Sequence, residues 1–257
     1  MTQCSAIFEG GQIKIITQLV NLLRSYSEDA LMLTCPDGIK LINMDVCHIM
    51  AFAVKLDLKN RSDNWPKIEE SMGLDLTRMA KMLRSLKQVD SLSMFIKPDQ
   101  DQIVLQAESR KPKRVSRFQI DAIHVEPETA QIEQNMKQCL KDYSIHLQVS
   151  SRAFFSLVEE TKASGTEVVS LIYEEGQLLL GSSDSLNSLE ADLISGDEPK
   201  EQLQTHLGLE KLVLIAKAYQ LGPTVSIYLN GSSYPVYFSY PVGDLGQLLI
   251  ALSPRIG

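Results

Sequence analysis

The sequence predicts an α+β protein with two similar domains, each an antiparallel sheet with two helices packed on one side. Amphipathic helical patterns alternate with short strand–turn–strand patterns along the chain. The order helix, hairpin, strand, helix, hairpin occurs twice, and such an internal repeat constrains the architecture strongly. The chain has 257 residues, of which 44% are hydrophobic and 22% charged. That is enough apolar material for two small cores.

The first half contains the elements of one such domain. An amphipathic helix is predicted over residues 11–25, with isoleucine, leucine and valine on one side. A Pro-Asp-Gly turn at 36–38 separates two short strands, and residues 48–58 follow as an apolar strand. Residues 74–87 form the second helix, and residues 91–109 alternate as a hairpin with a Pro-Asp turn.

Residues 121–143 interrupt these patterns. The stretch is rich in glutamate and glutamine, contains a proline and shows no strand alternation. We therefore expect a surface linker between domains. The domains are predicted over residues 1–120 and 144–257.

The pattern restarts after the linker. A helix is predicted over residues 151–162, a strand–turn–strand over 167–182, a second helix over 207–219 and a hairpin over 224–240. Gly176 takes the place in this half that Gly38 takes in the first. The repeat is the main reason to expect two domains of one kind.

The charge balance excludes some functions. With 25 basic and 32 acidic residues the net charge is −7, so a uniformly basic nucleic-acid binder is excluded, although a basic face is not. We expect no membrane span, which needs about 20 apolar residues, and no signal peptide. Four scattered cysteines without a Cys-x-x-Cys pair are expected to be reduced thiols.

The sequence predicts no catalytic residue, no metal site and no cofactor. It lacks a P-loop, a Gly-x-Gly-x-x-Gly and a Gly-x-Ser-x-Gly motif. The four histidines are far apart, and none forms a metal-binding His pair. Cys47 and His48 are adjacent, but neighbours on a strand point to opposite faces and do not readily share a ligand.

Two helices carry a positive face without acids. The polar side of residues 76–87 is entirely cationic, and that of residues 11–25 has no acid, whereas exposed helices usually mix lysine with glutamate. A solvated helix face remains an alternative. Segregated positive charge in an acidic protein costs repulsion, which a polyanion removes while releasing counterions. Without a base-reading motif, contacts to phosphate are favoured. In the second half Glu210 and Glu159 weaken the pattern.

A basic run lies at residues 110–114, with Arg117 nearby. It is interpreted as a nuclear-localisation signal, a loop that contacts DNA or a solvated hairpin loop. The residues leave these three readings open.

Over nearly its whole length, the sequence resembles the sliding clamps of the proliferating-cell-nuclear-antigen type. Three stretches carry the resemblance: residues 38–56 with a Met-Asp-x-x-His element, residues 72–86 with a Met-Gly-x-x-Leu helix entry, and residues 234–256. The last stretch ends in Asp-x-Gly followed by Leu-x-Pro-x-Ile.

The resemblance implies the DNA-clamp fold and a homotrimeric ring, with sheets outside and helices around a hole that holds double-stranded DNA. Such clamps tether DNA polymerase, catalyse no reaction and need an ATP-driven clamp loader. The implied location is the nucleus, or a site of viral DNA replication if the protein is viral. The residues expected to face DNA are Lys14, Arg24, Arg78, Lys81, Arg84, Lys87, Arg152, Lys211 and Lys217. Glu159 departs from the usual basic position.

Partners of such clamps dock a short peptide beneath the interdomain linker. The matching positions are Met44, His48, Ile49, Ala51, Pro235, Ala251, Leu252, Ser253 and Pro254. Ala251 replaces a usual tyrosine, which widens the expected pocket, and Ile132 or Met136 is expected to cover it.

The resemblance also implies that subunits join edge strand to edge strand. The expected edges are residues 115–120 and 178–182, with Val115, Phe118, Ile120, Leu178 and Leu180 at the interface.

Other readings remain open at this point. One alternative is that the chain is one subunit of a heterotrimeric checkpoint-type clamp. Another is that it is a monomeric processivity factor for a polymerase. Outside the clamps, a hydrolytic or nucleotide-modifying enzyme on an α+β repeat and a plain protein-interaction scaffold are the competing hypotheses. The missing catalytic motifs argue against the enzyme.

Overall fold

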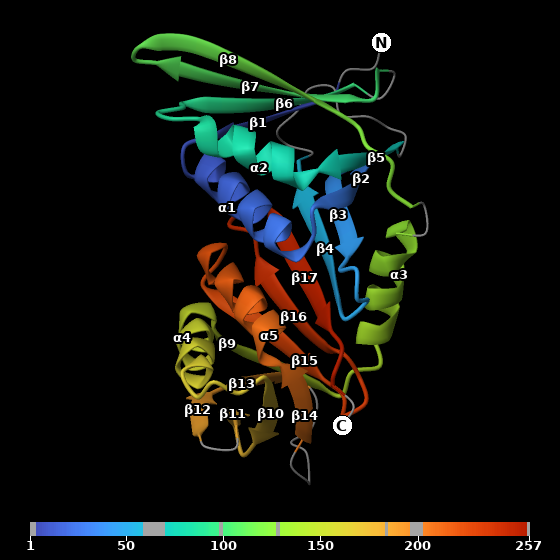
Figure 1. Cartoon of the computed structure of the whole chain (residues 1–257), viewed down its shortest axis with the longest axis vertical. Helices are drawn as coiled ribbons and strands as arrows, with labels where there is room; N and C mark the ends of the chain where they lie inside the picture. Colours follow the sequence, from blue (N-terminus) through green and yellow to red (C-terminus); the bar gives the residue numbers. More distant parts are fainter. Residues whose placement is uncertain are drawn as a thin grey trace. The chain divides into compact units, whose positions relative to one another are not determined.

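The computed structural model describes residues 4–58, 70–97, 100–126, 129–182, 185–195 and 203–255 (Figure 1). The chain divides into two compact units, each with antiparallel strand pairs and a pair of packed helices. Unit 1 consists of residues 1–44, 53–132 and 242–247, and unit 2 of residues 45–52, 133–241 and 248–257. The predicted α+β fold class is confirmed.

Unit 1 contains β1 (Cys4–Glu9), α1 (Gly11–Tyr26), β2 (Asp29–Cys35), β3 (Gly38–Met44), β5 (Glu70–Asp75), α2 (Leu76–Ser85), β6 (Ser91–Lys97), β7 (Gln102–Arg110), β8 (Lys113–Asp121) and the end of β4 (Met50–Asp57). Its strand orders are β1-β6-β7-β8 and β4-β3-β2-β5. Helices α1 and α2 pack against each other, and Figure 1 shows them along one face of the β1-β6-β7-β8 sheet. The predicted hairpin of β6 and β7 forms, but its Pro98-Asp99 turn lies outside the described residues.

Helix α1 follows the predicted pattern. Its apolar stripe is buried, as expected for a helix that packs through one face. The buried residues are Ile16, Leu19, Val20, Leu22, Leu23 and Tyr26. Lys14 and Arg24, on the polar side, are exposed.

Helix α2 is shorter than the predicted helix 74–87. It begins at Leu76 because the carboxylate of Asp75 caps it, with Oδ1 accepting a hydrogen bond of 2.7 Å from the backbone N–H of Arg78. The residues before the cap pair with β2 as strand β5, so Met72 to Asp75 of the Met-Gly-x-x-Leu element are strand and its Leu76 is the first residue of the helix. Lys87 lies beyond the C-terminal cap at Leu86.

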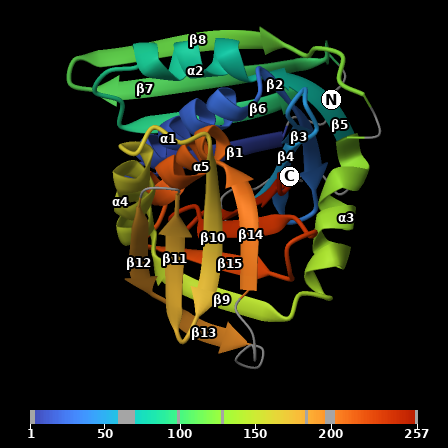
Figure 2. The same ribbon diagram turned by 60° about the horizontal axis from the view of Figure 1, so that its bottom comes forward.

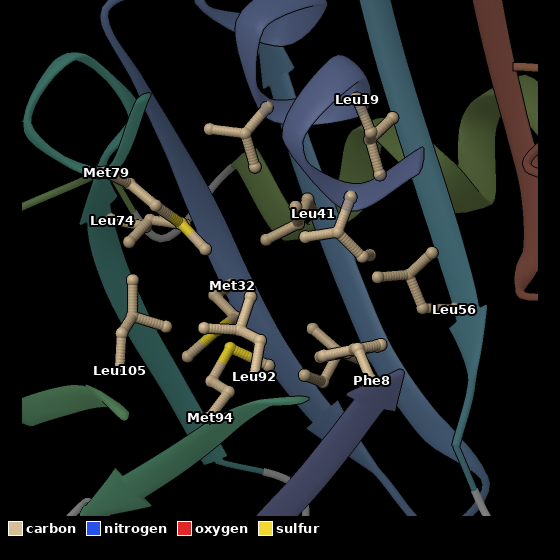
Figure 3. A pocket seen from close by; sticks show the side chains of 13 residues that line it. Phe8, Leu19, Met32, Leu41, Leu56, Leu74, Met79, Leu92, Met94 and Leu105 are labelled. Carbon is tan, nitrogen blue, oxygen red and sulfur yellow. The ribbon is translucent and has the colours of Figure 1, made fainter. Parts of the chain in front are cut away.

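The core of unit 1 is apolar. Figure 3 shows side chains from α1, from α2 and from strands of both sheets of the unit around a small cavity of about 30 Å³. Its lining includes Phe8, Leu19, Met32, Leu41, Leu56 and Met79. Close packing of this kind fixes where α1 and α2 lie on the sheets, and so where their polar sides face.

Glycines in the two predicted turns serve different purposes. Gly176 lies in the turn itself with φ of +75°, a conformation that favours glycine. Gly38 is instead the first residue of β3, opposite Cys35. A Cβ there would lie 1.8 Å from the carbonyl oxygen of Leu56, so any side chain is excluded. The predicted equivalence of Gly38 and Gly176 is therefore wrong by one position, because Gln177 is the first residue of its strand.

Unit 2 contains β9 (Ile145–Ser150), α4 (Ser151–Lys162), β10 (Val168–Glu174), β11 (Gln177–Gly181), β12 (Leu186–Glu190), β13 (Asp192–Ser195), β14 (Leu203–Gly208), α5 (Leu209–Ala216), the 3₁₀ helix η3 (Lys217–Gln220), β15 (Thr224–Leu229), β16 (Val236–Pro241) and most of β17 (Gly246–Leu252). Its strand orders are β12-β11-β10-β14 and β13-β9-β15-β16-β17. Helices α4 and α5 pack against each other. Figure 2 brings the first of these sheets forward.

The predicted linker contains a helix, α3 (Thr129–Leu140). The sequence analysis does not predict this helix. Thr129, Glu133 and Met136 are buried at a helical spacing. Lys137, one turn after Glu133, forms an ion pair with it. In the sequence, the occurrence of Ile132, Met136 and Leu140 at every fourth position is the pattern that indicates a helix here. Among the described residues, no helix is both long and apolar enough to cross a membrane.

Candidate nucleic-acid interface and docking surface

The exposed sides of α1 and α2 in unit 1 carry the predicted cations. Lys14, Arg24, Arg78, Lys81, Arg84 and Lys87 are all exposed. Arg78 forms an ion pair of 3.7 Å with Asp121, in which both side chains are about half exposed. The Arg84 Nε donates a hydrogen bond to the carbonyl of Ala80. Within the described part of the chain, the other four cations form no ion pair, so their charges face solvent.

The helices of unit 2 carry fewer free cations. Arg152 is exposed and its guanidinium lies 5.6 Å from the ring centre of Tyr219, and Lys217 is exposed on η3. On α4, Glu159 lies 3.8 Å from Lys162. This carboxylate on the polar side of α4 reduces its positive charge, as the sequence pattern indicated.

Lys211 differs from the other predicted DNA contacts. Its Nζ lies 2.7 Å from Oδ2 of Asp45, and the Asp45 side chain is only 3% exposed. A cation that already neutralises a buried carboxylate is poorly placed to release it for phosphate, because breaking a buried pair is costly. We therefore leave Lys211 out of the proposed DNA-contacting set.

Asp45 organises the loop that follows β3. Its Oδ1 accepts hydrogen bonds from the backbone N–H groups of Ile49 (2.8 Å) and Met50 (3.0 Å). Its own backbone N–H donates to the carbonyl of Met50, and its carbonyl accepts from the N–H of His48. Burial alone raises the pKa of Asp45. The hydrogen bonds from Lys211 and from the two backbone groups outweigh that effect, so the pKa lies below its ordinary value.

The loop held by Asp45 presents apolar side chains to solvent. Val46 is 96% exposed and Ile49 is 40% exposed, and Cys47 and His48 are also exposed. The carbonyl of Ile49 accepts a hydrogen bond of 2.8 Å from the backbone N–H of Ser253. The structure thus brings the predicted docking loop and the predicted C-terminal strip together within unit 2.

The remaining predicted docking residues divide into accessible and buried ones. Pro235, Ala251, Ser253 and Pro254 are partly exposed, whereas Ala51 and Leu252 are buried. Met44, at the end of β3, is half-buried and belongs to unit 1. Met136, one of the two residues expected to cover the site, is buried, and Ile132 is half-buried.

A tyrosine cluster supports Pro235. The hydroxyl of Tyr143 donates a hydrogen bond to the carbonyl of Pro235. Its ring packs edge-on against Tyr237 and Tyr234, at centroid distances of 5.1 and 6.4 Å. Burial raises the pKa of the Tyr143 hydroxyl, which therefore stays protonated and able to donate. The cluster fixes the segment that enters β16.

One of the two predicted subunit edges is misplaced. Strand β8, which carries Val115, Phe118 and Ile120, is an end strand of its sheet, and Val115 is 53% exposed while Ile120 is buried. Strand β11 is not an edge, because it lies between β10 and β12 (Figure 2), and Leu178 and Leu180 are fully buried. The end strand next to β11 is β12, where Leu186 is 62% exposed; the other end strand of this sheet is β14.

The sequence does not predict three features of these candidate sites. Asp45 is marked only as part of the Met-Asp-x-x-His element, and no sequence pattern marks Tyr143. The edge strand β12 follows a stretch of small polar residues that gives little strand signal. The contacts of Asp45 with Lys211 and of Tyr143 with Pro235 join segments that are far apart in the chain.

Comparison with known proteins gives a consistent answer. The family model described as "Proliferating cell nuclear antigen, N-terminal domain" matches residues 7–131. The chain is 25% identical to the proliferating cell nuclear antigen of Dictyostelium discoideum, over 95% of this chain and 97% of that protein. It is 22% identical to proliferating cell nuclear antigen 2 of Drosophila melanogaster, over 95% of each. The crystal structure of the Entamoeba histolytica antigen matches all of both chains with a TM-score of 0.81 at 16% identity.

The repeated α+β units and this structural match define a protein with the DNA-clamp fold. The family model over residues 7–131 and the two relatives over 95% of the chain show that this chain is similar to the proliferating cell nuclear antigens.

Proposed function

We propose that this protein is a DNA sliding clamp, which encircles double-stranded DNA without reading its sequence and serves as a processivity factor for DNA polymerase. The observation that carries the proposal is the exposed, acid-free cationic face of α1 and α2 in a protein of net charge −7. The proposed DNA-contacting residues are Lys14, Arg24, Arg78, Lys81, Arg84, Lys87, Arg152 and Lys217. Contacts of lysine and arginine to phosphate confer affinity without sequence preference.

We further propose that the protein docks replication and repair partners through a peptide site. The site combines the loop 46–49 with Pro235 and the strip 251–254. An apolar surface with a few fixed backbone groups is typical of such a site. Ala251, which leaves more room than a tyrosine, favours partners with a bulky apolar side chain at this point. The chain itself is proposed to catalyse no reaction, to be placed on DNA by an ATP-driven loader and to act in the nucleus.

Three copies are proposed to form the ring, with β8 of one copy pairing with β12 of the next. Both strands are ends of their sheets and therefore have unpaired backbone groups, which favour pairing with another chain. Exposed apolar side chains, Val115 on β8 and Leu186 on β12, would be covered. This pairing replaces the edge at residues 178–182.

The ring predicts that Val115→Glu and Leu186→Glu each reduce the solution mass from that of three chains to that of one, because a buried unpaired carboxylate disfavours the interface. Light scattering coupled to size exclusion measures the mass. Ile7→Glu on β1 and Ile194→Glu on β13 are matched controls, since both residues are about half exposed on other end strands. Equal masses for all four variants would contradict the assigned edges. A single-chain mass for the unaltered protein would contradict the homotrimer.

A further inference from the structure

The basic hairpin formed by β7 and β8 in unit 1 has no part in the proposed contacts of the helices. Arg110 and Lys113 are directly opposite each other across the hairpin, and like charges in this position are destabilising. The hairpin is held in place next to its turn, where the backbone N–H of Arg110 donates a hydrogen bond of 2.6 Å to Asp90. Its two-residue turn and paired strands also disfavour a localisation signal that must be bound as an extended chain.

The two faces of this hairpin differ in what they contact. Arg114 is opposite Ser109, and Ser116 is opposite Ala107, so these side chains share the face on which Leu105 and Ala107 are buried. Lys113 and Arg117 lie on the other face, where the Nε of Arg117 donates to Gln106. The Arg114 face is the one that α2 covers.

A small crevice of about 20 Å³ lies between this face and the end of α2. Lys87 and Arg114 line it from the two sides, together with Ser109 and Ser116. Both cations are exposed, and in the described part of the chain neither forms an ion pair or donates a side-chain hydrogen bond. The two serine hydroxyls likewise lack hydrogen-bond partners there.

The dipole of helix α2 does not by itself explain why cations lie on both sides of the crevice. The partial negative charge at the C-terminus of α2 favours cations nearby, which accounts for Arg84 and Lys87. Arg114, however, is on a strand and makes no hydrogen bond to the carbonyls at the end of the helix. Two full positive charges exceed the half charge of the helix terminus, so the crevice remains net positive. It also continues the row of cations on α2.

We propose that a phosphate of the DNA backbone binds at the mouth of this crevice, held by Lys87 and Arg114 and by hydrogen bonds from Ser109 and Ser116. The proposal rests on the proposed clamp function and adds a contact from the sheet to those from the helices. Phosphate oxygens suit this set of groups because lysine, arginine and serine side chains are common phosphate donors. Arg114 is thus proposed to contact DNA, whereas Lys113 and Arg117, on the other face of the hairpin, are not.

The test is equilibrium binding of the full chain to a short labelled DNA duplex over a series of KCl concentrations. Lys87→Gln with Arg114→Gln is expected to weaken binding and to reduce the slope of log affinity against log salt by about 0.9, because the two side chains together hold one phosphate and each neutralised phosphate contributes about 0.9. Ser109→Ala with Ser116→Ala is expected to weaken binding severalfold with the slope unchanged. Lys113→Gln with Arg117→Gln, which removes equal charge from the other face, is expected to change neither.

If the Lys87 and Arg114 double variant and the Lys113 and Arg117 double variant weakened DNA binding equally, the effect would be one of overall charge. That result would overturn the proposed phosphate site. Unchanged binding by the Lys87 and Arg114 variant would overturn it as well. Thermal unfolding and solution mass check that each variant is folded and assembled. A failure here leaves the clamp function intact, because that function is tested separately by the cations of α2.

Discussion

Charge reversal at Arg78, Lys81 and Arg84 together is expected to reduce clamp-dependent synthesis of long DNA products to the level of the polymerase alone. All three side chains are exposed on α2, so the fold and the thermal stability should be retained. Loss of three phosphate contacts lowers the salt dependence of DNA binding by about 2.7 in slope, and the new carboxylates add repulsion. Primer extension on a long template, with the loader present, measures the effect.

The matched control keeps the charge at the same positions. Arg78→Lys, Lys81→Arg and Arg84→Lys together should support nearly normal product lengths, because contacts to phosphate mainly require positive charge. If the charge-reversed protein instead supported full processivity, the assignment of α2 to DNA would be wrong. If the charge-preserving control also failed, the residues would act through packing rather than charge.

Replacement of Asp45 by alanine is expected to lower the free energy of unfolding by about 3 kcal/mol and to weaken peptide docking. The change leaves Lys211, whose side chain is 27% exposed, without its partner, and breaking an ion pair by removing one of its charges is destabilising. It also removes the acceptor for the N–H groups of Ile49 and Met50. Chemical denaturation measures the stability, and binding of a partner-derived peptide measures the docking surface.

The pH dependence of the free energy of unfolding distinguishes the effect of the Asp45 charge from that of its hydrogen bonds. The pKa of Asp45 is lower in the folded protein than in the unfolded chain. Its contribution to stability is therefore present above the unfolded value of about 3.9 and is lost as the pH falls through the folded value. Asp45→Asn should lose less stability than the wild type on acidification below about pH 4. An identical acid profile for both proteins would contradict the role of the ion pair.

Lys211 offers a second test of the same contact. Lys211→Arg should keep the pair with Asp45 and bind peptide normally, whereas Lys211→Met should weaken peptide binding and leave the salt dependence of DNA binding unchanged. The opposite pattern, with DNA binding reduced and peptide binding normal, would return Lys211 to the DNA-contacting set.

Periodicity alone was sufficient to predict the helices that position the cations. The apolar stripes of α1 and α4 identified both helices nearly to their ends, because burial on one face leaves a regular pattern. Strand β5 was missed because it runs directly into α2, and only the cap at Asp75 marks the boundary. Helix α3 was missed because its polar composition concealed the spacing of Ile132, Met136 and Leu140.

Pairing between distant segments could not be predicted from periodicity. The sequence shows only Glu210 next to Lys211, and the fold is needed to reveal Asp45 beside it. For a different reason, the apolar pattern of β11 fits a buried strand as well as an edge strand: the next strand in the chain, β12, gives little strand signal, and its pairing with β11 is what removes β11 from the edge. The resemblance to a family supplied the candidate residues, but the contacts determined which of them remain free to bind.

Retention on closed and linear DNA tests the central claim most directly. The protein is loaded onto a nicked circular plasmid with a clamp loader and ATP, separated from free protein and then treated with an enzyme that cuts the circle once. A ring that surrounds the duplex should remain on the circle at moderate salt and leave after the cut, by sliding off the ends. Equal retention on circular and linear DNA, or no retention on either, would contradict the account.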